Sequence, residues 1–309
     1  MKRNKRIIIS VCVTLVLVLA AAGLFTVIYR KNITQKIKDF PQETNEDGIV
    51  VDMLENPYFN RKQLGYSYPN PKTIKYYSDI TGTYRHAMVF LPAGYDENKE
   101  YPVLYLLHGL DGSHRTWKNK SADIILQNLY YFEDVPEMIV VCPNSAVNDE
   151  ENTDGLSITE KIGAYDLTAK DLVENLMPYI NSHYSVKTGR ENTAIAGNSM
   201  GGRNTMYAAF TYPELFGYVG VFSAANVLTD ERYAGVMYPL LDELTVTEDF
   251  NLIMLCVGRS DNVCGEVTYR LHDAMNEASI EHIFYDTEGG HQNTVWQNAL
   301  YNFTKKLWK

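Results

Sequence analysis

The chain has 309 residues, of which 45% are hydrophobic and 21% charged, with 20 glycines and 11 prolines. This composition excludes a disordered chain and allows a substantial core. Residues 1–38 carry eight Lys or Arg and no acid, which leaves 20 bases against 38 acids, a net charge of −18, in residues 39–309. An acidic body argues against binding to nucleic acid and against lying flat on an anionic membrane.

The first predicted element is an apolar segment at the N-terminus. Met1–Arg6 is basic, and Ile7–Tyr29 then runs for 23 residues without a charge, which is long enough to span a bilayer. The positive-inside rule keeps the basic end in the cytoplasm and sends the body across. Two interpretations are open: an uncleaved signal anchor, or a signal peptide cut near Ala20–Ala22. The apolar run continues past that site, which favours the anchor, and in both cases we expect an extracytoplasmic body.

Three segments are expected along the chain. Residues 1–30 are the signal anchor or signal peptide, and residues 31–65 are polar and mixed, as in a linker or stalk. Residues 66–309 have a length that suits one large α/β domain better than two small ones.

Apolar runs bounded by turn residues predict strands, and amphipathic stretches between them predict helices. The predicted strands are two within 73–91, then 101–107, 138–142, 192–197, 218–223, 251–257 and 281–285, and the predicted helices are 121–131, 166–184, 203–210, 267–278 and 294–308. Such alternation implies a mostly parallel central sheet with helices on both faces. Residues 144–163 are interpreted as a polar surface loop, and residues 224–250 as a partial lid over the site.

The most informative motif is G-x-S-x-G at Gly197–Gly201, between a buried strand and a helix. The turn is so tight that Ser199 is expected to adopt a strained backbone conformation with its hydroxyl exposed. Glycines are needed at both ends because side chains there would collide with the neighbouring strand and helix. The motif therefore predicts that Ser199 is a nucleophile.

A serine nucleophile needs a base within hydrogen-bonding distance and an acid that orients the base. His291 lies in a Gly-Gly-His loop after the last predicted strand and is the candidate base. Asp261 follows the preceding strand and is the candidate acid, with Asp286 and Glu288 as rivals. The order serine, acid, histidine is that of the α/β-hydrolases.

The tetrahedral intermediate of acyl transfer requires two hydrogen-bond donors for its oxyanion. One is expected to be the backbone N–H of Met200, and the other that of Leu110, which follows an early strand. His108, in the same loop, is expected to brace it. The candidate substrate contacts are Asn198, Trp117 and Trp296, although the position of Trp296 favours packing of the closing helix.

The cysteines give no sign of a metal or a disulfide scaffold. Cys142, Cys256 and Cys264 lack the spacing of zinc ligands, and they are interpreted as free, partly buried thiols, although Cys256 and Cys264 could pair across a loop. The acids within residues 149–154 do not fit a standard calcium loop. We expect no metal and no cofactor.

Three parts of the chain together are similar to a known family: Tyr101–Gly109, the motif at Gly197–Gly202, and Gly289–His291 with Trp296 shortly after. They resemble the esterase D-like α/β-hydrolases, which include feruloyl and acetyl-xylan esterases of carbohydrate esterase family 1, siderophore esterases, formylglutathione hydrolases and mycolyltransferases. The resemblance spans roughly residues 66–309. It implies an α/β-hydrolase fold, the triad Ser199, Asp261 and His291, and the oxyanion donors Leu110 and Met200.

The sequence thus leads to the hypothesis of an exported serine esterase that removes acyl groups, acetyl or feruloyl, from carbohydrates. One alternative is an acyltransferase of the same fold with a sugar or lipid acceptor. Another is a catalytically inactive surface protein that binds glycan. The expected partner is an acylated carbohydrate or another small ester, with no nucleic acid and with membrane contact only through the N-terminal segment.

Overall fold

The centre of the fold is an eight-stranded, mostly parallel sheet. A computed structural model describes residues 2–40, 42–51, 56, 58–225 and 250–309, with side chains from residue 14 onward. The strands are β1 (Lys72–Ser78), β2 (Thr83–Phe90), β3 (Val103–Leu107), β4 (Ile139–Pro143), β5 (Thr193–Asn198), β6 (Tyr218–Phe222), β7 (Leu252–Gly258) and β8 (Ile283–Thr287). Their order is β1-β2-β4-β3-β5-β6-β7-β8. The β1–β2 and β2–β4 pairs are antiparallel and all others are parallel, so the predicted sheet is confirmed.

Helices connect most of the parallel strands. They are α1 (Lys2–Lys38), α2 (Thr116–Asn119), α3 (Ala122–Phe132), α4 (Ile158–Asp166), α5 (Thr168–Asp171), α6 (Met177–His183), α7 (Met200–Thr211), α8 (Gly265–Glu277) and α9 (Asn293–Lys306). A π-helical turn, η1 (Leu172–Leu176), joins α5 to α6, and a short 3-10 turn, η2 (Arg190–Asn192), precedes β5. Pro178 follows the π turn and cannot donate a backbone hydrogen bond, so the regular helical ladder is interrupted there.

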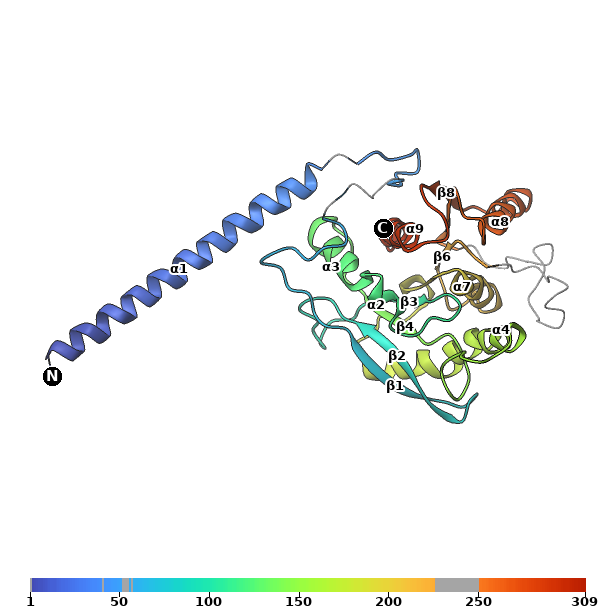
Figure 1. The fold of residues 1–309 in the computed structure, drawn as a ribbon, viewed down its shortest axis with the longest axis horizontal. Helices are drawn as coiled ribbons and strands as arrows, with labels where there is room; N and C mark the ends of the chain where they lie inside the picture. The colour runs from blue at the N-terminus through green and yellow to red at the C-terminus, as the bar shows by residue number, and fades with distance from the viewer. Residues whose placement is uncertain (1, 41, 52–55, 57, 226–249) are drawn as a thin grey trace.

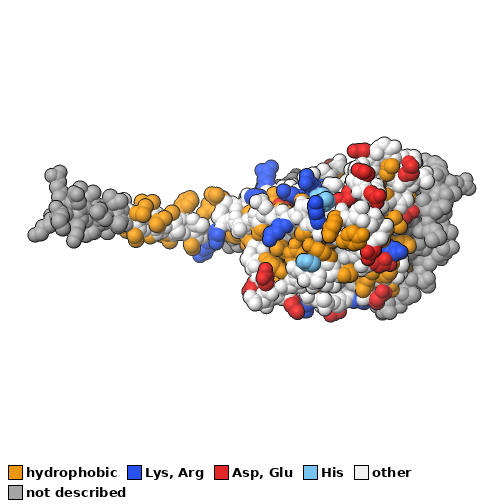
Figure 2. All heavy atoms as spheres, turned by 90° about the horizontal axis from the view of Figure 1, so that it is seen from below, with side chains coloured by type: hydrophobic (Ala, Val, Ile, Leu, Met, Phe, Trp, Pro, Cys, Tyr) orange, Lys and Arg blue, Asp and Glu red, His pale blue; other side chains and the backbone are white. Residues whose placement is uncertain are grey.

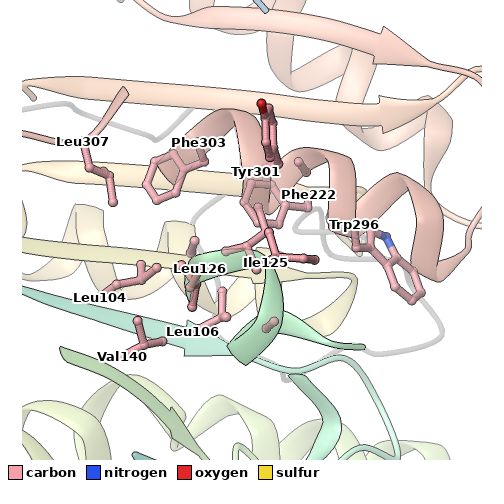
Figure 3. Packing of buried hydrophobic residues seen from close by; sticks show 14 of the residues in the cluster. Leu104, Leu106, Ile125, Leu126, Val140, Phe222, Trp296, Tyr301, Phe303 and Leu307 are labelled. Atoms are coloured by element: carbon pink, nitrogen blue, oxygen red, sulfur yellow. The ribbon is translucent and has the colours of Figure 1, made fainter. Parts of the chain in front are cut away.

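The sheet separates two apolar cores, because successive side chains of a strand point to opposite faces. In β3, Leu104 and Leu106 belong to the core under α3 and α9. The alternate residues Val103, Tyr105 and Leu107 belong to the core under α6, α7 and α8. Figure 3 shows the first core, where Leu104, Leu106 and Val140 lie opposite Ile125, Leu126, Phe303 and Leu307. Burial on both faces explains why the central strands read as continuous apolar runs.

Helix α1 projects from the domain as a long arm (Figure 1). Among the described residues it contains one stretch, Thr14–Lys38, that is long and apolar enough to cross a membrane by length and composition, with a mean hydropathy of 1.6. Figure 2 shows apolar side chains along this arm and several Lys and Arg side chains where it meets the domain.

The helix continues past the expected end of the apolar segment and packs on the domain. Ile33 and Ile37 are buried in a cluster with Phe132 of α3. Arg30 also donates a hydrogen bond from its Nε to the carbonyl of Gly65, 2.5 Å away. The start of the expected linker is therefore a helix in contact with the domain.

A second part of the expected linker, Ile49 and Val50, also differs from the prediction, because it packs into the core. Ile49 and Val50 are 0% and 2% exposed. The Asn302 side chain of α9 accepts a hydrogen bond from the Val50 N–H and donates one to the Val50 carbonyl, each at 2.9 Å. Two adjacent apolar residues have no periodicity, so the sequence pattern did not reveal this contact.

The two segments with unusual length have different outcomes. Residues 144–163, expected to be a surface loop, contain most of α4, which begins with a capping box between Ser157 and Glu160. The apolar side of α4 packs against Met200, so this segment borders the predicted site. The partial lid expected over 224–250 falls almost entirely on residues 226–249, which lie outside the described residues.

Candidate active site

Ser199 occupies the sharp turn between β5 and α7. Its backbone has φ 56° and ψ −122°, a conformation that L-residues rarely adopt, so the predicted strain is confirmed. A Cβ on Gly197 would lie 2.5 Å from the Gly201 carbonyl oxygen, and one on Gly201 would lie 2.5 Å from the Leu107 carbonyl oxygen. Both glycines are therefore required by close backbone approach, as the sequence predicted.

Three loops at the carboxyl ends of parallel strands bring Ser199, His291 and Asp261 into one line. Ser199 follows β5, Asp261 follows β7, and His291 follows β8. The Ser199 Oγ lies 2.9 Å from the His291 Nε2, and the His291 Nδ1 lies 2.9 Å from the Asp261 Oδ2. The rival acid Asp286 instead accepts a hydrogen bond from Arg259 at 2.7 Å. The geometry suits a hydroxyl, a base and an orienting acid.

The Asp261 carboxylate is held in its charged form. Its side chain is 0% exposed, and its Oδ1 accepts hydrogen bonds from the N–H groups of Val263 and Cys264 at 3.0 and 2.8 Å. Burial raises the pKa of Asp261, but the hydrogen bonds from His291 and Cys264 lower it more, and the pKa is about 2. A charged Asp261 can only accept, so the His291 Nδ1 donates and its Nε2 is left to accept the Ser199 proton.

The thiol of Cys264 lies beside Ser199 and interacts with its side chain. Burial, followed by the charge of Asp261, raises the pKa of Cys264 to about 12, so the thiol stays protonated and does not compete as a nucleophile. Cys142, Cys256 and Cys264 are all free and buried, as expected. Among the described residues, no group of three or more His, Cys, Asp or Glu side chains is placed to hold a metal ion.

The loop after β3 is fixed by hydrogen bonds to the Gly109 carbonyl. The Tyr165 hydroxyl donates to this oxygen at 3.0 Å, and the His108 Nδ1 lies 2.8 Å from it. Because a trans peptide directs its N–H opposite to its C=O, the Leu110 N–H points away from these donors. Leu110 and Met200, the two expected oxyanion donors, pack in the same apolar cluster.

His108 braces this loop in the neutral form. Its Nε2 accepts a hydrogen bond from the backbone N–H of Ser145 at 2.8 Å, so its Nδ1 carries the proton donated to Gly109. The ring is 1% exposed, and burial lowers the pKa of His108 to about 4. The histidine thus has the structural place that its sequence position suggested.

Two of the three expected substrate contacts point into the protein, which corrects the prediction. Trp117 is 1% exposed, and its indole N–H donates to the Leu107 carbonyl at 2.9 Å. Asn198 is also 1% exposed, and its Oδ1 accepts a hydrogen bond from Lys120. Only Trp296 borders the triad, with its ring 5.0 Å from the His291 ring in a T-shaped arrangement.

Sequence reasoning missed three residues around the triad: Lys120, Tyr165 and Cys264. Cys264 lies three residues after Asp261, and that proximity was an available signal. Tyr165 was hidden at the border between a polar loop and a helix. Lys120 lies in the polar run Lys118–Lys120, where nothing distinguishes a buried lysine from an exposed one.

The sheet order, the strained serine after β5 and the His291 loop after β8 define an α/β-hydrolase. The chain belongs to the Esterase family, which it matches over residues 78–307. It is therefore a member of the Esterase family with an α/β-hydrolase fold.

Solved structures include close matches in fold. The chain is 32% identical to the CE1 ferulic acid esterase of the anaerobic fungus Anaeromyces mucronatus without substrate, with a TM-score of 0.76 over 86% of this chain and 97% of that chain. The same fungal esterase in complex with ferulic acid is 33% identical, with a TM-score of 0.73 over 82% of this chain and 95% of that chain.

A curated relative is the endo-1,4-beta-xylanase/feruloyl esterase of Xylanibacter ruminicola, 27% identical over 85% of this chain and 35% of that protein. The chain thus spans about a third, or less, of the length of the curated relatives it matches.

Proposed function

We propose that the chain is an exported serine esterase that hydrolyses feruloyl esters of carbohydrates through an acyl-enzyme. The observation that supports this most strongly is the continuous hydrogen-bonded line from the Ser199 Oγ through His291 to Asp261, with both distances at 2.9 Å. A serine hydroxyl is a weak nucleophile unless such a base accepts its proton.

In the acylation step, the Ser199 Oγ attacks the ester carbonyl carbon while the His291 Nε2 takes the hydroxyl proton. Asp261 stabilises the imidazolium that forms. The N–H groups of Leu110 and Met200 receive the oxyanion, and removing one such donor typically lowers kcat by about 10²–10³-fold. The intermediate then collapses and the bond to the sugar oxygen breaks, His291 protonates that leaving oxygen to give the free sugar hydroxyl, and the acyl group remains on Ser199.

In the deacylation step, water repeats the attack. His291 takes a proton from the water, the oxygen adds to the acyl carbonyl, and the same two N–H groups receive the oxyanion. Collapse breaks the bond to Ser199, which recovers its proton from His291. The products are the free acid and the unchanged enzyme.

The comparisons favour a feruloyl over an acetyl group. The similar fungal esterase was solved in complex with ferulic acid, and the bacterial relative is a xylanase/feruloyl esterase. Trp296 packs against the His291 ring and is 9% exposed, so only its edge could meet an aromatic acyl group. An aromatic acyl group attached to a plant-type polysaccharide is the substrate class that agrees with these features.

The N-terminal helix supports a membrane-anchored form of the exported enzyme. Cleavage near residues 20–22 would leave the packed turns with Ile33 and Ile37 in place, so those contacts do not by themselves exclude processing. The long uncharged run lies within α1 and continues past the possible cleavage site, which favours retention of the N-terminal segment. Two experiments test this part of the proposal. The first looks for the intact N-terminus in purified membranes, and the second asks whether protease added outside the cell digests the esterase domain.

The catalytic part is tested with a fluorophosphonate probe and with methyl ferulate and p-nitrophenyl acetate as substrates. Ser199→Ala is expected to abolish labelling and to lower kcat by about 10⁶-fold, because the nucleophile is lost. Ser182→Ala, at an exposed serine of α6, is the matched control and should keep both. Retained labelling and turnover in Ser199→Ala would reject the triad. Acyl transfer to an added sugar, in preference to water, would instead favour a transferase.

A further inference from the structure

A buried lysine without a carboxylate partner lies next to the triad. Lys120, between α2 and α3, is 7% exposed, and its Nζ donates a hydrogen bond to the Asn198 Oδ1 at 2.9 Å. Among the described residues, no Asp or Glu forms an ion pair with it, whereas the buried Arg85 and Arg203 each pair with an aspartate. Leaving a cation buried without an anion is costly, so Lys120 calls for an explanation other than stability.

Two indole rings enclose the ammonium group. The Lys120 Nζ lies 4.8 Å from the centre of the Trp117 ring and 4.1 Å from that of the Trp296 ring. Such contacts attract a cation through the negative face of the ring. Burial lowers the pKa of Lys120 to about 7, while the rings and the Asn198 oxygen favour its charged form.

The lysine contacts both halves of the catalytic machinery. Asn198 directly precedes Ser199, and a Cβ on Gly109 would lie 3.2 Å from the Asn198 Nδ2 and 3.1 Å from the Ser199 Cβ. The Asn198 amide therefore lies between the lysine and the loop that supplies one expected oxyanion donor. On the other side, Trp296 contacts Lys120 and also packs against the His291 ring.

We propose that Lys120 is a positioning residue for the esterase reaction. Its ammonium group holds Asn198 and Trp296 in place, and it adds a positive charge behind the turn where the tetrahedral intermediate becomes negative. Charges fixed in a site of low dielectric stabilise a developing oxyanion more than they would in water. This inference rests on the proposed function, since it concerns the same acyl-transfer reaction.

Within the part of the chain that the structure describes, the other groups that contact Lys120 are uncharged. Strand β5 presents Asn198, α2 presents Trp117, and α9 presents Trp296 together with Gln297, whose amide donates to the Lys120 carbonyl. The titratable neighbour is His108 in the loop after β3, and burial keeps the pKa of His108 at about 4. Loss of the Lys120 proton should therefore appear by itself as a fall in kcat above about pH 7.

The first test compares Lys120→Met, Lys120→Arg and the exposed control Lys118→Met, with kcat and KM measured on methyl ferulate from pH 5 to 9. Lys120→Met is expected to lower kcat about 10-fold or more with KM within about twofold, because charge stabilisation acts on the transition state. Lys120→Arg should recover part of kcat and lack the fall above pH 7, because arginine keeps its charge. Lys118→Met should match the wild type.

A second variant covers the case in which Lys120→Met does not fold. Asn198→Asp keeps the shape of the side chain and its bond to Lys120 but neutralises the local positive charge. We expect kcat to fall about 10-fold and the alkaline limb to move to higher pH, because a carboxylate favours the charged lysine. A wild-type kcat and pH profile in Asn198→Asp, or in a folded Lys120→Met, would overturn the role of Lys120, while the Ser199→Ala result would still decide the triad.

Discussion

Two buried cations of this esterase, Arg85 and Lys120, have opposite surroundings. The Arg85 side chain is 0% exposed and pairs with Asp171 at 3.1 Å. Its other donors reach the carbonyls of Asn144 and Asn148 at 2.6 and 3.1 Å. Lys120 has a single amide oxygen and two indole rings as its partners.

The difference separates a structural cation from one placed for chemistry. Arg85 joins β2, the end of β4 and α5, and its charge is compensated by hydrogen bonds and by Asp171. Burial lowers the pKa of Arg85, but Tyr76 and Asp171 raise it more. Lys120 donates a hydrogen bond to Asn198, the residue before Ser199, and no described carboxylate compensates its charge. A buried cation whose charge is fully paired contributes to a stable fold. A buried cation whose charge is only partly paired can act on charge that develops at a reacting centre.

The largest effect expected on the catalytic side is that of Asp261→Asn. An amide cannot hold the His291 tautomer in the same way, so kcat should fall by about 10⁴-fold. The melting temperature should fall by only a few degrees, because the side chain keeps its shape and its hydrogen bonds from Val263 and Cys264 while the stabilising charge is lost. Steady-state kinetics and thermal melts measure both. A kcat within tenfold of the wild type would remove Asp261 from the triad.

The matching effect on the structural side is that of Arg85→Met. It leaves Asp171 buried without its cation, which typically costs about 3–5 kcal/mol of the free energy of unfolding. For a domain of this size the melting temperature should fall by about 10 °C. The folded fraction should keep its kcat on methyl ferulate, since the triad is not touched.

The control for Arg85→Met is Lys170→Met, which removes an exposed cation of α5, and it should change the free energy of unfolding by less than about 0.5 kcal/mol. A low kcat with a normal melting temperature in Arg85→Met would contradict the division between the two cations.

A smaller effect concerns alkaline pH. The pKa of Lys120 in the folded chain is about 7, below the usual 10.5 of lysine, so the unfolded chain binds more protons between these values. The free energy of unfolding of the wild type should therefore rise from pH 7 to 9 relative to that of Lys120→Met. Urea titrations at several pH values measure this difference. Parallel pH dependence in the two proteins would show that the lysine is as well solvated when folded as when unfolded.

The smallest effect concerns acid. The pKa of Asp261 is about 2 in the folded chain, below its usual 3.8, so its stabilising contribution is complete above pH 4. It should be lost as the pH falls through 2, and it amounts to about 2 kcal/mol. The difference in free energy of unfolding between wild type and Asp261→Asn should therefore shrink between pH 4 and pH 2. A constant difference over that interval would contradict the low pKa.

The sequence predicted which three side chains meet at the candidate site better than it predicted what surrounds them. Ser199 and its flanking glycines were identifiable because a short motif fixes a backbone conformation. Asp261 and His291 were identifiable because the carboxyl ends of parallel strands meet at one edge of the sheet. The inward orientation of Trp117 and Asn198 was not predictable, since a pattern does not tell which side of a loop a side chain faces. Lys120 and the buried pair Ile49 and Val50 depend on contacts with α9, which only the folded chain brings together.

The continuous helix at the N-terminus has a consequence for how the enzyme meets its substrate. If the apolar part of α1 lies in a bilayer, the contacts of Ile33 and Ile37 with α3 fix the catalytic domain at a set height and tilt above the lipid surface. Substrate polymers would then have to approach the cell, because a domain packed on a helix cannot move away from the membrane as a domain on a flexible linker would. The depth of the polysaccharide layer that is accessible to hydrolysis would be set by helix geometry, at about 1.5 Å for each residue of α1 beyond the membrane.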